Sequence, residues 1–340
     1  MRIRPLETAD EQRWDDFVGA APDATFFHRA GWRRVIEQGA GLPTHYLYAE
    51  EQGAVTGILP LAHVHSRLFG NALVSTPFCV EGGAVAADAA TRLALEATAG
   101  ELGRSLGVDW VEFRNAADSA SGRPQKPLYA LFRKAIGGDE AALRAAIPRK
   151  QRAVIRKAEA MGLDCQPSAD PDRFYDLYAE SVRNLGTPVF PRSLFRLLPE
   201  VFGEDCRILE VSRGGQPLAA VMSFYFRDAV MPYYAGARPE SRSCQGQDFL
   251  YWRLMCAAAA AGRRCFDFGR SKAGTGAYAY KRHWGFEPEP LHYEYELIGV
   301  PKVPDLNPLN PKYRLFIALW KRLPLPLSKL IGPRLAIYLG

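Results

Sequence analysis

Residues 107–114 read GVDWVEFR, and residues 262–270 read GRRCFDFGR. Each stretch follows a long segment rich in Ala and Leu, at residues 88–106 and 247–261, whose composition is typical of a helix. Each then reads as a short strand of apolar and aromatic residues that ends in an acid–Phe pair. The same order of helix and strand therefore occurs twice in the chain.

A second pair of similar segments lies upstream of the first. Residues 53–61 read GAVTGILPL and residues 215–223 read GQPLAAVMS, and both have the pattern of a turn followed by an apolar strand. The two pairs are separated by nearly equal lengths of chain, and loops of unequal length absorb the difference. Together they predict a duplicated chain of two related halves.

The second half has a characteristic order of predicted elements. We expect two helices, an antiparallel meander of three strands, a third helix and two further strands, at residues 171–184, 193–202, 207–212, 217–227, 230–235, 247–261, 265–269 and 291–297. This order indicates an α/β (α+β) acyltransferase-like fold rather than the strict β-α-β alternation of a dinucleotide-binding sheet. The expected domains are residues 1–147, residues 148–300 and a basic amphipathic tail at residues 301–340.

The distribution of charge along the chain limits which classes of macromolecule this protein is expected to bind. The chain has 43 Lys and Arg residues against 37 Asp and Glu, a formal net charge of +6. Residues 301–340 hold seven bases and one acid, Asp305, so the whole excess lies in the tail and the first three hundred residues are neutral. This pattern excludes a uniformly basic nucleic-acid-binding coat, and no DNA partner is expected.

Cysteine usage and hydropathy indicate the compartment. The six cysteines are scattered without a C-x-x-C pair, which favours free thiols in a reducing compartment. The N-terminal segment lacks the apolar region of a secretory signal, and no run of about 18 apolar residues predicts a membrane-spanning helix. We therefore expect a cytoplasmic protein that can bind peripherally to the inner face of the cytoplasmic membrane.

Three further segments carry a resemblance to a known family. They are FDFGRSKAGTGAYAYKRHWGFEPEPLHYEYEL at residues 266–297, SVRNLGTPVFPRSLFRLLPEVFG at residues 181–203, and NPLNPKYRLFIALWKRLPLPLSKLIGPRLAIYLG at residues 307–340. They resemble the FemAB family, and more narrowly the FemAB-like proteins associated with exosortase/PEP-CTERM systems of Gram-negative bacteria. The resemblance covers most of residues 140–340 and the first half in outline.

The resemblance implies a fold and a reaction class. FemAB proteins consist of two tandem GNAT-like acyltransferase domains, with mixed, mostly antiparallel sheets flanked by helices. Characterised members transfer an amino acid from aminoacyl-tRNA to an amine of a peptidoglycan precursor. For the exosortase-associated subgroup, the resemblance implies a transferase linked to exopolysaccharide or cell-envelope production.

Lys281 and Asp267 are the candidate catalytic residues. A lysine in the matching segment of FemAB proteins is attributed to the active site, so Lys281 is expected to stabilise negative charge during transfer; without the resemblance, a solvated surface lysine is the ordinary alternative. Asp267 ends a predicted strand, where a carboxylate can orient or deprotonate an amine or form a structural ion pair with Arg270. Chain spacing reveals no Ser-His-Asp or Cys-His arrangement, which favours direct transfer without a covalent enzyme intermediate.

Other residues are expected to contact substrates. Arg183 and Thr187 lie in the segment that borders the acceptor cleft in the family, although Gly186 and Pro188 also explain this segment as a helix end. The residues expected around the candidate lysine are Arg270, Tyr280 and Trp284.

The start of the long second-half helix is a candidate phosphate-binding site. Backbone N–H groups at Gln245, Gly246 and Gln247 can hold a phosphate of a co-substrate. The segment lacks the spacing of the R/Q-x-x-G-x-G/A loop of GNAT enzymes that use acyl-CoA. The co-substrate is therefore either aminoacyl-tRNA or acyl-CoA, with no bound cofactor expected. His63 and His65 alternate along a strand, but no third ligand is near in sequence, so no metal is expected.

Two basic segments indicate partners. The residues Arg149, Lys150, Arg152, Arg156 and Lys157 form one face of a predicted helix. This face contacts either tRNA phosphates, an anionic lipid-linked saccharide or peptide precursor, or only solvent. In the tail, Asn310 and Pro311 predict a helix start, and Pro324 predicts its end. The aromatic and apolar residues of this helix favour an interfacial membrane anchor, with packing of the tail on the first domain as the alternative.

The sequence as a whole predicts an N-acyltransferase or aminoacyltransferase that modifies an amine of a cell-envelope or exopolysaccharide precursor. Two alternatives stay open. One is an acyl-CoA-dependent GNAT N-acetyltransferase, and the other is a non-catalytic adaptor associated with the membrane.

Overall fold

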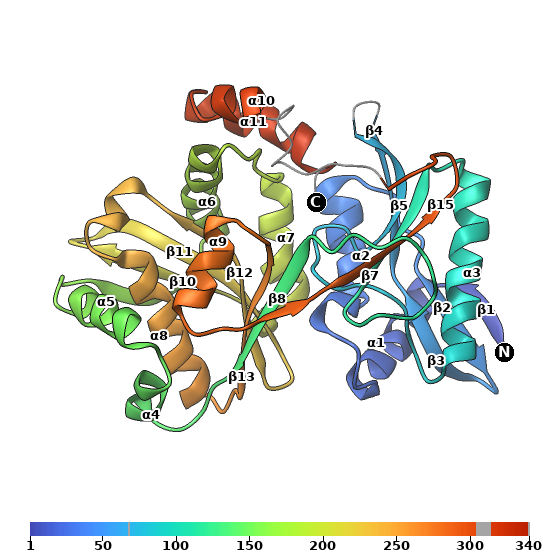
Figure 1. The fold of residues 1–340 in the computed structure, drawn as a ribbon, viewed down its shortest axis with the longest axis horizontal. Coiled ribbons are helices and arrows are strands. Elements are labelled where there is room, and N and C mark those ends of the chain that lie inside the picture. Colours follow the sequence, from blue (N-terminus) through green and yellow to red (C-terminus); the bar gives the residue numbers. More distant parts are fainter. Residues whose placement is uncertain (67–68, 304–313, 339–340) are drawn as a thin grey trace. The chain divides into compact units, whose positions relative to one another are not determined.

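The computed structural model describes residues 1–66, 69–303 and 314–338, and Figure 1 shows the fold. The chain divides into two compact units that alternate along the sequence. The first contains the described parts of residues 1–127, 290–303 and 334–338, and the second contains those of residues 128–289 and 314–333. This division differs from the one expected from the sequence, because the expected boundary at residue 147 falls inside the second unit.

The first unit has two four-stranded sheets. One has the antiparallel order β1-β2-β3-β6, and the other has the order β15-β7-β5-β4, in which β5 and β7 are parallel. The strands are β1 (Arg2–Pro5), β2 (Leu47–Glu51), β3 (Ala54–Leu59), β4 (Leu61–Ser66), β5 (Gly70–Ser75), β6 (Val85–Ala86), β7 (Trp110–Asn115) and β15 (His292–Leu297).

Helices flank these sheets. They are η1 (Thr8–Asp10), α1 (Glu11–Ala20), η2 (Phe26–His28), α2 (Gly31–Arg34), the π-helix η3 (Val35–Ala40) and α3 (Ala89–Leu106). The side chain of Asp88 caps α3 by accepting from the Thr91 N–H at 2.7 Å, and Gly107 ends the helix in the left-handed conformation. Local sequence therefore sets both ends of α3, which packs on β2, β3 and β7.

The second unit has one seven-stranded sheet in the order β14-β8-β13-β12-β11-β10-β9. The strands are β8 (Tyr129–Ala135), β9 (Asp164–Ser168), β10 (Cys206–Arg213), β11 (Gln216–Phe226), β12 (Ala229–Ala237), β13 (Cys265–Lys272) and β14 (Pro288–Pro290). Pairing is antiparallel from β9 to β12, and β12 and β13 are parallel. The predicted mixed, mostly antiparallel sheet flanked by helices is confirmed.

Helices cover both faces of this sheet. They are α4 (Glu140–Ala145), α5 (Arg149–Glu159), α6 (Pro171–Leu185), α7 (Arg192–Phe202), η4 (Gly203–Asp205), η5 (Pro239–Arg242), α8 (Gly246–Ala260) and α9 (Gly276–His283). Side chains along β11 point alternately to the two faces of the sheet. Val221 packs in the core cluster on the side of α8, whereas Phe224 contacts Phe202 of α7 on the other side. The helices and the three-strand meander predicted from the sequence are present with bounds shifted by one or two residues.

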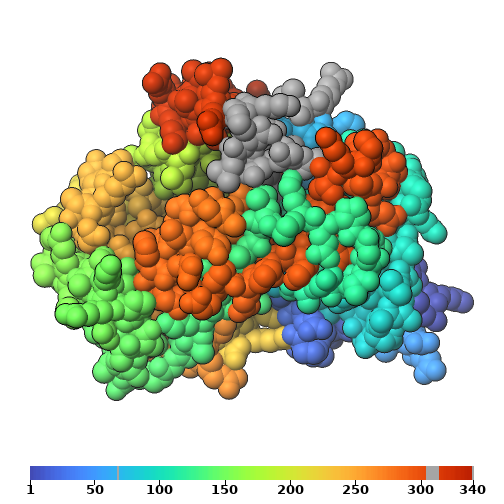
Figure 2. Space-filling view, in the orientation of Figure 1, coloured from blue at the N-terminus to red at the C-terminus, as the bar shows by residue number. Residues whose placement is uncertain are grey.

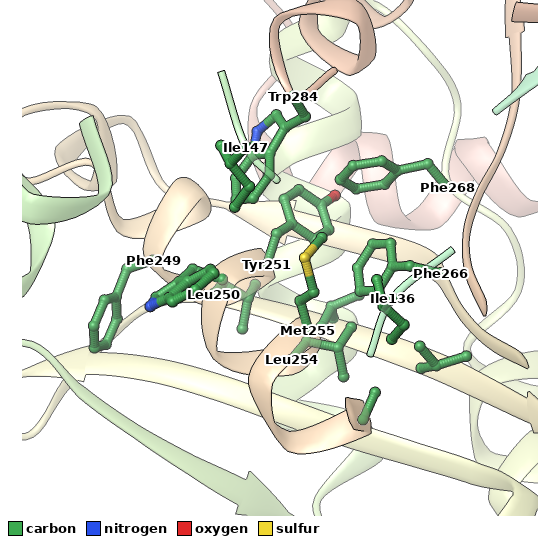
Figure 3. Close-up of a cluster of buried hydrophobic side chains, with 14 of the residues drawn as sticks. Ile136, Ile147, Phe249, Leu250, Tyr251, Leu254, Met255, Phe266, Phe268 and Trp284 are labelled. Atoms are coloured by element: carbon green, nitrogen blue, oxygen red, sulfur yellow. The ribbon is translucent and has the colours of Figure 1, made fainter. Parts of the chain in front are cut away.

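Helix α8 is the centre of the second unit's core. It is apolar on nearly every side and is therefore buried rather than amphipathic. Figure 3 shows Leu250, Tyr251, Leu254 and Met255 of α8 among the aromatic side chains of the cluster. Trp284, which follows α9, is fully buried in the same cluster, so the core holds the segment that carries Lys281.

The duplication predicted from the sequence corresponds to a repeated arrangement of strands. In the first unit α3 connects parallel strands β5 and β7, and in the second α8 connects parallel strands β12 and β13. The next strand of each sheet comes from elsewhere in the chain. It is β15 beside β7 and β8 beside β13, both antiparallel.

The final strand thus corrects one expectation. The strand expected at residues 291–297 was assigned to the second half, but it forms β15 and pairs with β7 in the first unit. Pairing satisfies the backbone groups along the β7 edge. It also buries Glu294, which accepts hydrogen bonds from Ser119 and Ser121.

The tail forms two helices, α10 (Arg314–Trp320) and α11 (Leu325–Ala336). The end of the first helix before Pro324 agrees with the sequence prediction. The expected helix start at Asn310 and Pro311 lies outside the described residues. Among the residues that are described, no helix is both long enough and apolar enough to cross a bilayer.

Candidate active site in the second unit

The parallel strands β12 and β13 diverge near the candidate residues. Their register joins Ala229 to Cys265 and Val230 to Phe266, at the beginnings of both strands. Further along, β13 pairs with β8 through an irregularity between Asp267 and Arg270. Gly269 lies within this irregularity and Arg270 at its end.

Asp267 holds the backbone of this irregularity. Its Oδ1 accepts a hydrogen bond from the Gly269 N–H at 2.7 Å, and its Oδ2 accepts from Arg133 Nε at 2.8 Å. Gly269 has a φ of +67°, a left-handed conformation that favours glycine. Asp267 is only 5% exposed. Its buried carboxylate therefore fixes the backbone bend through two hydrogen bonds, one to each oxygen.

Lys281 binds the carbonyls that the bend presents. Its Nζ donates to the Gly269 oxygen at 3.0 Å and to the Arg270 oxygen at 2.9 Å. The side chain is 9% exposed, and Nζ lies 5.4 Å from the centroid of the Phe132 ring. The surface-lysine alternative is therefore wrong for this side chain.

Burial changes the acidity of this amine. It lowers the pKa of Lys281 to about 7, and the repulsion of Arg270 acts in the same direction, whereas attraction by Asp267 opposes the shift. Near neutral pH the amine exists in both protonation states, which is the range in which a group can exchange a proton during a reaction.

A hydrogen-bonded junction connects α9 to α5 and α8. Asp248 Oδ1 accepts from Tyr280 Oη at 2.9 Å and from Gln151 Nε2 at 2.7 Å. Thr275 caps the start of α9 by accepting from the Tyr278 N–H. The cap and the junction fix the helix that carries Lys281.

Sequence reasoning missed two members of this site. Arg133 reaches Asp267 because β8 and β13 are neighbours, and no sequence pattern predicts that pairing. Gln151 has a detectable signal, because it is a polar residue on the apolar side of α5 and is buried there. The alternative partner proposed for Asp267 was Arg270, whose guanidinium lies 4.6 Å from the ring centroid of Tyr129.

The candidate phosphate-binding residues begin α8. Gln245 precedes the helix with a φ of +58° and donates through Nε2 to the Arg242 oxygen at 3.0 Å. Gly246 is buried and Gln247 is exposed. Their contact with a phosphate stays a prediction.

The other predicted substrate contacts have separate surroundings. Trp284 is fully buried in the core, and Tyr280 is bonded to Asp248. Arg183 donates to the Lys321 and Leu323 oxygens of the tail at 3.3 and 3.4 Å. Thr187 follows the end of α6, where its N–H donates to the Val182 oxygen. Substrate contact by these residues stays a prediction.

The predicted basic helix is α5, and its charged face is accessible. Arg149, Lys150, Arg156 and Lys157 are exposed, and Arg152 is partly exposed. Pro148 is the residue that precedes the first turn of the helix. An exposed basic face of this kind fits each of the alternatives, contact with phosphates, with an anionic lipid-linked precursor or with solvent.

The corresponding edge of the first unit is filled by its own loop. Residues 76–83 follow β5 and are buried. The N–H groups of Gly82 and Gly83 donate to the Arg114 oxygen at 3.2 and 3.1 Å, and the Arg114 side chain pairs with Glu112 at 2.8 Å. Loop N–H groups thus bind the β7 carbonyl here, whereas the carbonyls of β13 bind a lysine amine.

The alternating histidines lie on β4 of the first unit. His63 Nε2 lies 2.6 Å from Asn71 Oδ1. Within the described ranges, no group of three or more His, Cys, Asp or Glu side chains has the arrangement of a metal site.

Comparisons with known proteins agree with this architecture. Residues 143–282 match the family described as Acetyltransferase (GNAT) domain, a segment that contains Asp267 and Lys281. No curated protein sequence shows significant similarity to the chain.

Solved structures share the fold over most of the chain. The crystal structure of FemX matches with a TM-score of 0.69 and 13% identity, covering 88% of this chain and 98% of that chain. The C-terminal domain (DUF2156) of a protein assigned as a lysylphosphatidylglycerol synthetase from Agrobacterium fabrum matches with a TM-score of 0.58 and 14% identity, covering 87% and 99%. A tandem GNAT protein from the clavulanic acid biosynthesis pathway matches with a TM-score of 0.55 and 15% identity, covering 89% and 99%. The chain therefore has a FemAB-like tandem GNAT fold, with the acetyltransferase (GNAT) domain in its second half.

Proposed function

We propose that this protein is a FemAB-like N-acyltransferase or aminoacyltransferase whose catalytic centre lies in the second unit. Its acceptor is an amine of a cell-envelope or exopolysaccharide precursor at the inner face of the cytoplasmic membrane. The observation that carries the proposal is the buried Lys281 amine, fixed by two carbonyls at the bend of β13.

Lys281 has one donor left for the substrate. A protonated lysine amine has three N–H bonds, of which two serve Gly269 and Arg270. The third can donate to the donor carbonyl oxygen as the acceptor amine attacks and negative charge develops there. In a water-poor site such a donor lowers the barrier, because its charge is already in place.

Asp267 acts through the backbone in this proposal. Its bond to the Gly269 N–H fixes the bend that holds the lysine, so we assign it a positioning role in addition to its electrostatic support of the lysine cation. The acyl group moves directly from donor to acceptor amine: the new C–N bond forms, the bond from the acyl carbon to its carrier breaks, and the amine proton leaves with the carrier or with solvent.

Two donor classes stay in the proposal. Aminoacyl-tRNA is supported by the exposed bases of α5, whose positive charge can contact phosphates, and by the similarity to FemX. Acyl-CoA is the alternative and is supported by the GNAT domain match. Calorimetry with acetyl-CoA separates them, because heat of binding is expected only for an acyl-CoA enzyme.

Mass spectrometry of envelope glycans and lipid-linked intermediates tests the function. Cells with and without this protein are compared, and we expect a mass difference of one acyl or aminoacyl group in an amine-containing intermediate. The same comparison tests the proposed connection to exosortase/PEP-CTERM systems. A non-catalytic adaptor instead predicts unchanged pathway output when Lys281 and Asp267 are replaced together.

A further inference from the structure

Exposed apolar side chains are concentrated in the two tail helices. Nine large apolar side chains are exposed in the described part of the chain, and six of them belong to α10 and α11. We call these six side chains the tail face. They are Leu315, Phe316, Leu319, Leu327, Leu330 and Ile331.

The opposite sides of both helices pack on the second unit. Gly186 at the end of α6 approaches α10 so closely that an added Cβ would stand 2.5 Å from Ile317. Trp320 is 4% exposed. Gly332 of α11 lies close to Val189, because an added Cβ would stand 3.0 Å from the Val189 backbone nitrogen. At helical spacing, the packed residues lie on one side of each helix and the tail-face residues on the other. The tail face therefore points away from the second unit.

Ion pairs and hydrogen bonds hold the helices in this orientation. Arg183 donates to two carbonyls at the end of α10, and Lys329 of α11 pairs with Asp176 of α6 at 2.8 Å. The exposure of the tail face is therefore a property of a docked pair of helices rather than of an unpacked chain end. Figure 2 shows the red atoms of these helices at the surface of the molecule.

The charged residues of the tail itself have one sign. Arg314, Lys321, Arg322 and Arg334 are exposed in the tail. Residues 314–338 contain no Asp or Glu. The apolar side chains of the tail face, combined with the exposed bases of the same two helices, complement a surface that is apolar beneath a negatively charged layer.

We propose that the tail face docks on the surface of a bilayer that contains anionic phospholipid. The inference rests on the membrane location in the proposed function and names the surface that makes the contact. The two helices have 7 and 12 residues, which are too few to cross the hydrocarbon core, so they lie in the interfacial plane. The apolar side chains enter the acyl boundary while the four exposed bases contact lipid phosphates.

Vesicle flotation of the full chain tests this docking. We expect binding to phosphatidylcholine vesicles that contain phosphatidylglycerol, weaker binding without phosphatidylglycerol, and release at high salt. Replacing Leu319 and Leu330 with Ser is expected to weaken binding about tenfold or more. Replacing Lys321 and Arg322 with Gln is expected to weaken it about tenfold.

Matched controls distinguish docking through the tail face from nonspecific adsorption to vesicles. Leu93 of α3 is 58% exposed, against 57% for Leu319, so Leu93→Ser removes an equally exposed leucine outside the tail and is expected to leave binding unchanged. Arg156→Gln with Lys157→Gln is the matched loss of two neighbouring bases on α5. Circular dichroism confirms that each variant is folded.

Three outcomes would overturn the proposal: no binding of the full chain to anionic vesicles, equal loss with Leu93→Ser, or concentration-dependent dimerisation that the leucine substitutions abolish. The last outcome would assign the tail face to a second copy of the chain. Transfer to a soluble acceptor without vesicles is measured in parallel, so that failure of docking and failure of the catalytic proposal give different results.

Discussion

Lys281 is the residue on which the proposed chemistry depends, and its substitution is the direct test. Lys281→Ala removes the donor to the reacting carbonyl, and we expect kcat to fall by about 10²–10³-fold. The matched control is Lys302→Ala, an exposed lysine of the first unit. Full activity of a folded Lys281→Ala protein would show that the lysine does not take part.

The acidity of Lys281 also predicts how stability depends on pH. The folded-state pKa of about 7 lies below the value of about 10.4 for an unfolded chain, so the unfolded state binds more protons between these values and stability rises with pH. Between about pH 6 and about pH 9, the wild-type free energy of unfolding is expected to increase by about 2–3 kcal/mol relative to Lys281→Met. Urea denaturation of both proteins measures the difference, and parallel pH curves would contradict the burial of a titrating amine.

The Asp267 carboxylate predicts a shift in the same titration. Because attraction by Asp267 raises the Lys281 pKa, Asp267→Asn is expected to move the lysine-dependent limb of the kcat profile to lower pH and to reduce kcat about tenfold. A purely structural carboxylate predicts lower stability with an unmoved pH profile. The conservative Asp267→Glu variant, which keeps the charge, is expected to restore the position of the limb.

At the scale of elements, the contact between α6 and β12 is close enough to be tested with a single methyl group. A Cβ on Gly236 would stand 2.5 Å from the Tyr178 Cα and 2.6 Å from its backbone nitrogen, so helix or strand must move. Gly236→Ala is expected to destabilise the second unit by about 1–3 kcal/mol. Gly276→Ala is the control, since its Cβ meets no atom within 4 Å, and equal thermal unfolding of the two variants would contradict this packing.

Individual helices and strands of the second half were predicted correctly from the sequence, whereas the pairing of some strands was not. The apolar run of β11, the helical pattern of α6 and the Ala- and Leu-rich composition of α8 are local features, and each predicts its element. The neighbours of β13 and β7 are not local, because strand pairing depends on which edges remain free after the other elements have packed. For this reason β15 was expected in the second half.

For the whole molecule, the pairing of β15 with β7 predicts that the C-terminal part of the chain stabilises the first unit. Deleting residues 290–340 removes β15 and leaves Ser119 and Ser121 without their bonds to Glu294. We expect faster hydrogen exchange in β7 (Trp110–Asn115), measured by mass spectrometry. Deleting only residues 304–340 keeps β15 and serves as the control. Unchanged protection of β7 in the longer deletion would contradict the pairing of β15 with this strand.

The sequence by itself determined the duplication, the helix and strand content of the second half and the basic tail, and through the family resemblance it made Lys281 a candidate. These depend on periodicity, composition and a family motif, all of which are local in the chain. Only the tertiary structure decided that Lys281 is buried against the Gly269 and Arg270 carbonyls, that Arg133 is the partner of Asp267, and that β15 belongs to the first unit. These facts depend on burial and on pairing between distant segments, which set both the pKa of an amine and the partner of a strand edge.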